Sequence, residues 1–146
     1  MMATGGGPHR GPRRRRKPGR EGRRRAWRKG RWAESFSAWY LRLCGYRILA
    51  RGWRCSAGEI DIVARKGRAL AVIEVKQRAS ITQAGDAVTS HQRRRISRAA
   101  AAYLAHRPAL ANLFVRFDVM AVRPWRIPLH IKDAWREFEP GDGGVL

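Results

Sequence analysis

The stretch GEIDIVARKGRALAVIEVKQR, residues 58–78, decides the predicted fold, because acidic and apolar side chains alternate in two short runs within it. Alternation with period two is typical of β-strands that bury one face. We therefore predict strands over residues 59–63 and 72–76. Residues 65–68, Arg-Lys-Gly-Arg, form the predicted turn, so the two strands make a hairpin.

The hairpin carries Asp61 on its first strand and Glu74 and Lys76 on its second. Alternate residues of a strand share a face, so Glu59 lies with Asp61, and Glu74 lies with Lys76. Pairing of the two strands can place those faces side by side. We expect two carboxylates and one amine to meet at one place.

The composition predicts a folded, basic protein with a polyanionic partner. The 146 residues suit one domain, and 44% of them are hydrophobic. The formal net charge is +21, with 32 Lys and Arg against 11 Asp and Glu, which favours nucleic acid or an anionic membrane surface. The sequence has no apolar run of about 18 residues and no signal-peptide pattern, so we expect a cytoplasmic location without membrane insertion.

Three segments differ in composition. Residues 1–30 are Gly, Pro and Arg with few apolar side chains, so we predict a disordered basic arm. Residues 31–139 form the predicted domain, and residues 140–146 a frayed tail. The arm has two open interpretations, an electrostatic tether for phosphates or a dispensable extension.

A helix is predicted from Trp32 up to Gly45, which ends it. Its apolar stripe follows helical spacing and comprises Ala33, Phe36, Tyr40 and Leu43. Glu34 lies beside this stripe. It is either a first-turn acid that is favourable to the helix dipole or a member of an acidic site. A short strand over residues 46–51 and a loop follow.

A second helix is predicted over residues 90–106, from its alanines and its apolar spacing. Arginines near a helix N-terminus oppose the helix dipole, so local helix stability does not explain those found here. They either contact phosphates or form a solvated face. The candidate nucleic-acid residues are Arg78, Arg93, Arg94 and Arg98.

The remaining elements are an internal strand over residues 113–122, a turn at residues 124–128, and a short strand that runs into a turn of helix over residues 129–138. The fold class is α/β or α+β, a mixed sheet of four or five strands flanked by helices.

The side chains of the hairpin suit phosphodiester hydrolysis. Mg²⁺ prefers oxygen ligands and keeps several waters, so Asp61 and Glu74 suffice as protein carboxylates, and Mn²⁺ is an alternative. Lys76 can hold the attacking water and balance the charge of the transition state. The competing interpretation of Glu-Val-Lys on a strand is an exposed face with a marginal salt bridge.

Asp61 followed by Glu74-Val75-Lys76 resembles the PD-(D/E)xK signature of the restriction-endonuclease-like superfamily, and Glu34 is similar to the helix acid of its Holliday-junction-resolvase branch. More closely, the chain resembles the YraN-like family of bacterial proteins of unassigned function. The resemblance covers about residues 30–138, through Gly30, Glu34 and the segments 45–49, 58–61, 73–78, 116–119, 130–131 and 134–135.

The resemblance implies a sheet flanked by helices, a divalent metal at Asp61 and Glu74, and Lys76 as catalytic base or water-orienting group. We expect a Mg²⁺- or Mn²⁺-dependent nuclease, with Glu34 completing the acidic cluster and branched or damaged DNA as candidate substrates. DNA is expected in preference to RNA, and a homo-oligomer stays open. The alternatives are a non-catalytic nucleic-acid-binding protein and a membrane-surface protein held by the arm.

Overall fold

The computed structural model of the protein describes residues 19–77 and 88–136, without the side chains of residues 23–29. Several sequence-based predictions fall outside the described residues. These are the arm up to residue 18, Arg78 and the loop that follows it, and the tail.

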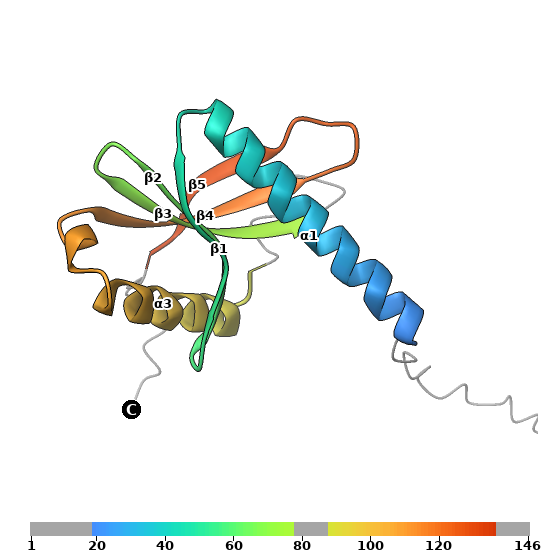
Figure 1. Ribbon diagram of the computed structural model, residues 1–146, viewed down its shortest axis with the longest axis horizontal. Coiled ribbons are helices and arrows are strands. Elements are labelled where there is room, and N and C mark those ends of the chain that lie inside the picture. The colour runs from blue at the N-terminus through green and yellow to red at the C-terminus, as the bar shows by residue number, and fades with distance from the viewer. Residues whose placement is uncertain (1–18, 78–87, 137–146) are drawn as a thin grey trace, which may run out of the picture.

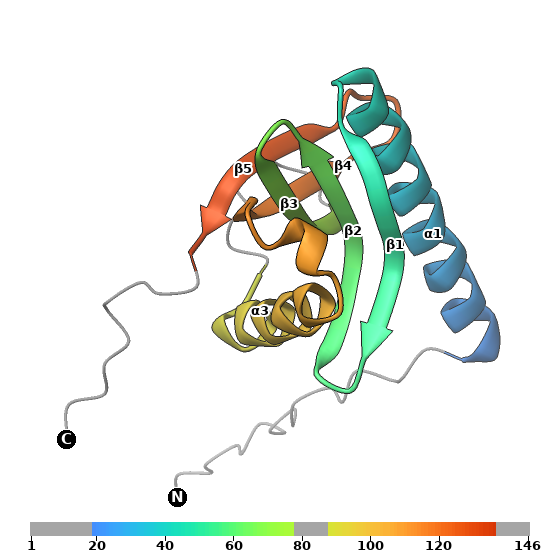
Figure 2. The same cartoon turned by 60° about the vertical axis from the view of Figure 1, so that its left-hand side comes forward.

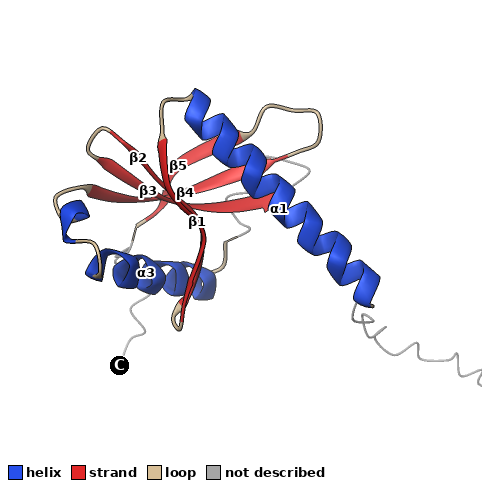
Figure 3. Cartoon of the chain, in the orientation of Figure 1, coloured by secondary structure: helices blue, strands red, loops and turns tan. Residues whose placement is uncertain are grey.

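A five-stranded mixed sheet lies between two α-helices, which confirms the predicted fold class (Figures 1 and 3). Helix α1 lies on one face of the sheet and α3 on the other. In chain order the elements are α1 (Arg20–Leu43), β1 (Arg47–Cys55), β2 (Gly58–Lys66), β3 (Ala69–Gln77), α3 (Ser90–Ala105), the 3₁₀ turn η1 (Pro108–Leu110), β4 (Phe114–Val122) and β5 (Leu129–Trp135).

The strand order in the sheet follows the chain, β1-β2-β3-β4-β5. Strands β1, β2 and β3 are antiparallel neighbours, and β4 and β5 are antiparallel too. The pair β3 and β4 is parallel, because the chain crosses over through α3 before it enters β4 (Figure 2). Both β3 and β4 therefore end at the same edge of the sheet.

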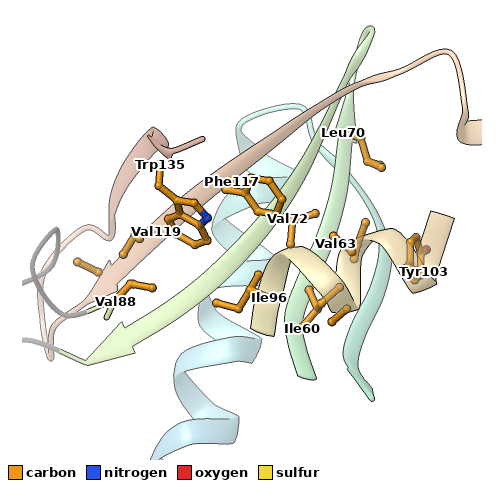
Figure 4. Close-up of a cluster of buried hydrophobic side chains, with 13 residues drawn as sticks. Ile60, Val63, Leu70, Val72, Val88, Ile96, Tyr103, Phe117, Val119 and Trp135 are labelled. Carbon is orange, nitrogen blue, oxygen red and sulfur yellow. The ribbon is translucent and has the colours of Figure 1, made fainter. Parts of the chain in front are cut away.

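The core has two layers, one on each face of the sheet. On the α3 side, Ile96 and Tyr103 pack against sheet residues that include Val63 and Val72 (Figure 4). On the α1 side, the buried helix residues Ala33, Ala38 and Leu41 pack on the sheet. Burial of both faces fixes the register, since a slip by one residue would exchange them.

Helix α1 corrects two predictions. It begins at Arg20, so residues 20–30 are helical where we predicted the disordered arm. Arginine has a good helix propensity, and Glu21 adds a favourable charge in the first turn. Leu43, predicted on the buried stripe, is 66% exposed, whereas Leu41 is fully buried. The apolar spacing allowed two neighbouring stripes, and packing on the sheet selected the other one.

Two strand boundaries also differ from the predictions. Strand β1 extends to Cys55 through a segment predicted as a loop, because Trp53 and Arg54 pair with β2. Gly52 has a φ of 56° within it, a conformation that favours glycine. At the other end of the chain, the described part of the predicted turn of helix is strand β5, held by pairing with β4.

Candidate functional site

Strands β2 and β3 separate at Asp61, and this fork forms the candidate site. Their pairing runs from Lys66 with Ala69 to Ile62 with Ile73. Beyond that pair, the backbone N–H of Val75 donates to Oδ2 of Asp61 at 2.8 Å. The Asp61 carboxylate thus provides the acceptor for the Val75 N–H, which lies beyond the last residue pair between the two strands.

A cavity of about 180 Å³ lies between the fork and α3. Asp61 and Glu74 both line it, together with Glu59, Gln92, Arg95 and Ile96. The Nζ of Lys76 lies 3.1 Å from Oε1 of Glu74, and both side chains are only 15% exposed. The structure therefore brings Asp61, Glu74 and Lys76 together, although their chemical roles stay predictions.

The electrostatics of the fork centre on Asp61. The pKa of Asp61 is raised to about 8, chiefly by burial; the nearby Glu74 carboxylate adds to this increase, and the hydrogen bond from Val75 opposes both effects. Without a cation, the site therefore favours retention of one proton among these neighbouring carboxylates near neutral pH. A cation at the same place would favour the ionised carboxylate instead.

Glu59 connects this cavity with a second one. It also lines a groove of about 710 Å³ between α1 and β1, and Glu34 lies on that groove. Burial raises the pKa of Glu34, and the Glu59 charge raises it further. Glu34 also contributes to the raised pKa of Asp61. Glu34 is thus an electrostatic neighbour of Asp61 across the fork, but it does not line the cavity of Asp61 and Glu74.

The groove is lined by arginines that the sequence analysis did not select. Arg31, Arg51 and Arg54 lie along it with Gly30, Glu34, Ser35, Gly52 and Glu59. Arg51 donates to Oγ of Ser35 at 2.7 Å, and Arg54 pairs with Glu59 at 3.0 Å. We predicted Arg51 at the end of a strand and Arg54 in the loop after it, and only the pairing of β1 with β2 reveals that both belong beside the acids.

The arginines of α3 have different environments. Nε of Arg93 donates to the carbonyl of Val88 at 3.1 Å, so this side chain contacts the segment directly before the helix. Arg94 and Arg98 are exposed. Arg95, absent from our candidate set, lines the acidic cavity, as Gln92 does one turn earlier. Their i, i+3 spacing was the signal that could have identified this face.

Strand β2 and helix α3 approach each other closely at Gly58. A Cβ built on Gly58 would lie 3.2 Å from the carbonyl oxygen of Arg95, which leaves no room for a side chain without a shift. Thr89 and Gln92 form a capping box that fixes the start of α3. The position of Arg95 therefore depends on a glycine at position 58.

The donor set of the fork fits a hard divalent cation with few protein ligands. Within residues 19–77 and 88–136, no group of three or more His, Cys, Asp or Glu side chains is arranged to hold an ion. Asp61 and Glu74 each keep one carboxylate oxygen outside the contacts with Val75 and Lys76. Two carboxylates with waters match Mg²⁺, which retains part of its hydration shell.

A second polar cluster lies on the α1 side of the sheet and surrounds Asp118, which is fully buried. Arg116 donates to both Asp118 oxygens at 2.8 Å, and His130 Nε2 lies 2.7 Å from Oδ2. The backbone N–H of Asp133 donates to Oδ1 at 2.9 Å. Burial alone would raise the pKa of Asp118, but these hydrogen bonds outweigh it and lower that pKa. We interpret this cluster as structural.

The sequence profile described as Uncharacterised protein family UPF0102 matches residues 33–122. The chain belongs to the UPF0102 family. This confirms the YraN-like family assignment that the motifs indicated. The UPF0102 match includes Glu34, Asp61, Glu74 and Lys76, and so covers the whole candidate site.

Other UPF0102 proteins resemble this chain over most of their own length. One from Paramagnetospirillum magneticum is 54% identical over 115 residues, which cover 76% of this chain and 89% of that protein. One from Parvibaculum lavamentivorans is 50% identical over 111 residues, covering 76% and 84%. One from Caulobacter vibrioides is 49% identical over 117 residues, covering 80% and 94%.

The helices in the described part of the chain include none that is long and apolar enough to cross a membrane.

Proposed function

We propose that this protein is a metal-dependent nuclease that hydrolyses phosphodiester bonds of nucleic acid. The observation that carries the proposal is the convergence of Asp61 and Glu74 on one cavity, with Lys76 in contact with Glu74. Asp61 and Glu74 suit a metal ion that compensates charge on the phosphate and binds a water. Lys76 suits stabilisation of the transition state.

Asp61 and Glu74 would hold the divalent ion, Mg²⁺ or Mn²⁺. When bound, this ion supplies charge neutralisation at the phosphate and lowers the pKa of a water. The raised pKa of Asp61 supports the assignment, because two neighbouring carboxylates in a partly buried cavity disfavour their own ionisation, and a bound cation would remove this penalty. Glu59, on the wall of the same cavity, and Glu34, beyond it, would add to the negative potential that attracts a cation.

Lys76 would orient the attacking water and compensate the additional negative charge as the phosphate reacts. Its ammonium is held against Glu74 and is only 15% exposed, so its position is fixed before substrate arrives. An ammonium donates hydrogen bonds and accepts none, so proton removal from the water would require a carboxylate or a neutral lysine.

The charge of the chain supports a nucleic-acid substrate. The net charge is +21, and arginines lie on both sides of the acids, with Arg95 on α3 and Arg51 and Arg54 in the groove. Each phosphate that an arginine neutralises releases counterions and adds affinity that does not depend on sequence. Together these arginines would hold a strand across the fork.

One observation favours a second candidate, a nucleic-acid-binding protein without catalysis. Lys76 forms an ion pair with Glu74 in the structure, and such a pair can have a purely structural role without catalysis. This alternative predicts salt-sensitive binding and no metal-dependent product.

The test incubates the full chain with forked, single-stranded and duplex DNA and with RNA, in Mg²⁺, in Mn²⁺ or in EDTA. We expect products only with a metal, and a loss of at least about a hundredfold in rate in Asp61→Asn, Glu74→Gln and Lys76→Met. Glu21→Gln is the matched control, because Glu21 is an exposed acid in the first turn of α1.

Cleavage that persists at the wild-type rate in Asp61→Asn and Glu74→Gln would exclude the assigned site. Tight binding with no product under any metal condition would favour the non-catalytic alternative. Preparation of Asp61→Asn and Glu21→Gln in parallel separates the protein's own activity from that of a contaminating nuclease, because a contaminant would cut equally in both preparations.

A further inference from the structure

The loop between β4 and β5 carries a tryptophan that is wholly exposed. Trp125 has a relative exposure of 103%, and Ile127 on the same loop has 75%. In the part of the chain that the structure describes, no stacking or cation–π contact involves the Trp125 ring. A large apolar ring held in water, with neither face covered, is typical of a contact surface rather than of a folded core.

The loop holds Trp125 in a constrained conformation. Its φ is 58°, in the left-handed region that bulky residues rarely adopt. Pro124 and Pro128 flank it in the sequence and restrict the backbone on both sides. The backbone N–H of Arg126 donates to the carbonyl of Arg123 at 3.4 Å, which closes the turn. Little backbone freedom would therefore be lost when the ring meets a ligand.

This loop leaves the sheet at the edge where the candidate site lies. In the parallel pair of β3 and β4, Lys76 is registered with Ala121 and Gln77 with Val122. The chain enters the loop directly after Val122, so the loop starts beside the end of the strand that carries Glu74 and Lys76. Figure 1 shows the loop between β4 and β5 at the same end of the sheet as the end of β3.

A comparison with α1 distinguishes Trp125 from the other exposed aromatic residues. Trp32 and Phe36 stack on each other at 5.4 Å between ring centroids, and Phe36 and Trp39 at 5.7 Å. These rings partly cover each other along the helix. Trp125 has no such neighbour in the described residues, so both of its ring faces can accept a planar group.

We infer that Trp125 stacks on an unpaired nucleobase next to the candidate site, while Arg123 and Arg126 contact the adjoining phosphates. This inference rests on the proposed nucleic-acid function and names the substrate feature, a base that is unstacked at a branch, fork or single-stranded end. Stacking on an aromatic side chain tolerates any base, because every base has a π-face.

Charge favours nucleic acid over a second copy of the chain as the occupant. The net charge is +21, and arginines stand on both sides of Trp125 in the loop. Two such loops would repel each other, whereas a polyanion is attracted to them. A fully paired duplex exposes base faces only at its two ends, so the ring would discriminate between paired and unpaired substrates.

The experiment measures binding of the full chain in EDTA, where no metal-dependent cleavage occurs. Fluorescence anisotropy compares a forked duplex that carries two unpaired arms with a fully paired duplex of equal length. Trp125→Ala should weaken binding to the fork about tenfold and binding to the duplex less than about twofold, because a stacked base contributes at this scale. Trp125→Phe should retain most of the fork affinity.

The salt dependence separates stacking from charge. Trp125→Ala should leave the slope of log affinity against log salt unchanged, whereas Arg126→Gln should reduce its magnitude by about one. Val115→Ala is the matched control, because Val115 is 40% exposed at the opposite end of β4. It should bind both substrates as the wild type does.

Equal losses on fork and duplex, or no loss on the fork, would overturn the inference. So would a change of sedimentation coefficient in Trp125→Ala at the assay concentration, because the ring would then lie between two copies. The readout is independent of catalysis: a protein that binds forks through Trp125 and never cuts them would contradict the proposed nuclease and leave the stacking role intact.

Discussion

Asp61 and Val75 face each other where β2 and β3 separate, and the Asp61 carboxylate accepts the Val75 N–H at 2.8 Å. The bond holds the carboxylate beside Glu74 in a partly buried position; desolvation and the Glu74 charge raise the pKa of Asp61 to about 8, although the bond itself opposes them. The two ionised carboxylates therefore repel each other at the fork, and a bound proton or cation reduces this repulsion. The first two predictions follow from this relationship.

Asp61→Asn should stabilise the metal-free protein by about 1–2 kcal/mol at pH 7.5, because it removes a partly buried acid beside Glu74 and keeps an oxygen for Val75. The folded-state pKa is raised, from an ordinary value of 3.8, so wild-type stability falls as pH rises from about 4 to about 8. Thermal melting in EDTA should thus show a higher Tm for the variant at pH 7.5 and nearly equal values below pH 4. A lower Tm at pH 7.5 would contradict this.

Binding of Mg²⁺ or Mn²⁺ should release about one proton per ion at pH 7, because Asp61 binds as the ionised carboxylate and its pKa is about 8 without metal. Affinity should rise with pH up to about 8 and then level off. Calorimetry in buffers of different ionisation enthalpy measures the released proton. Affinity that does not change between pH 6 and pH 8 would disprove the link.

Asp118→Asn should destabilise the protein by about 3 kcal/mol near neutral pH, since the variant leaves Arg116 without its buried ion-pair partner. The lowered pKa of Asp118 means that its contribution is present above about pH 4 and is lost as pH falls further, through the folded-state pKa. Urea unfolding at pH 7 and at pH 3 tests both statements. A deficit that is equally large at pH 3 would show that charge is not the cause.

Gly58→Ala and Gly30→Ala should change stability in opposite directions. An added methyl at position 58 would press on the carbonyl oxygen of Arg95, so we expect a loss of about 1–2 kcal/mol. Gly30 lies inside α1 with nothing within 4 Å of its Cβ position, so alanine should add about 0.5–1 kcal/mol. Chemical denaturation of both variants provides the comparison, and equal effects would contradict the packing argument.

Arg51→Gln and Arg54→Gln should each weaken nucleic-acid binding for every sequence tested and lower the salt slope by about one, if the groove holds phosphates. Arg65→Gln is the control, because Arg65 is exposed at the other end of β2, where its Nε bonds to the carbonyl of Gly67. An equal loss in Arg65→Gln would indicate attraction by net charge alone.

Local pattern predicted the elements well and their ends less well. The hairpin of β2 and β3 and the helix α3 follow from period two and from helical spacing. By contrast, the segment at Gly52 and Trp53 reads as a loop, and only pairing with β2 makes it a strand. Leu43 and Leu41 fit neighbouring stripes of one helix, and only packing on the sheet buries Leu41 and leaves Leu43 exposed.

The sequence by itself determined the alternation that places Asp61, Glu74 and Lys76 on a hairpin, because strand geometry relates residues two apart without reference to the rest of the chain. Only the tertiary structure decided that Asp61 carries a raised pKa, that Arg95 and the groove arginines border the acids, and that Trp125 stands uncovered. These properties depend on distances and burial between segments far apart in the chain, and no local pattern encodes them.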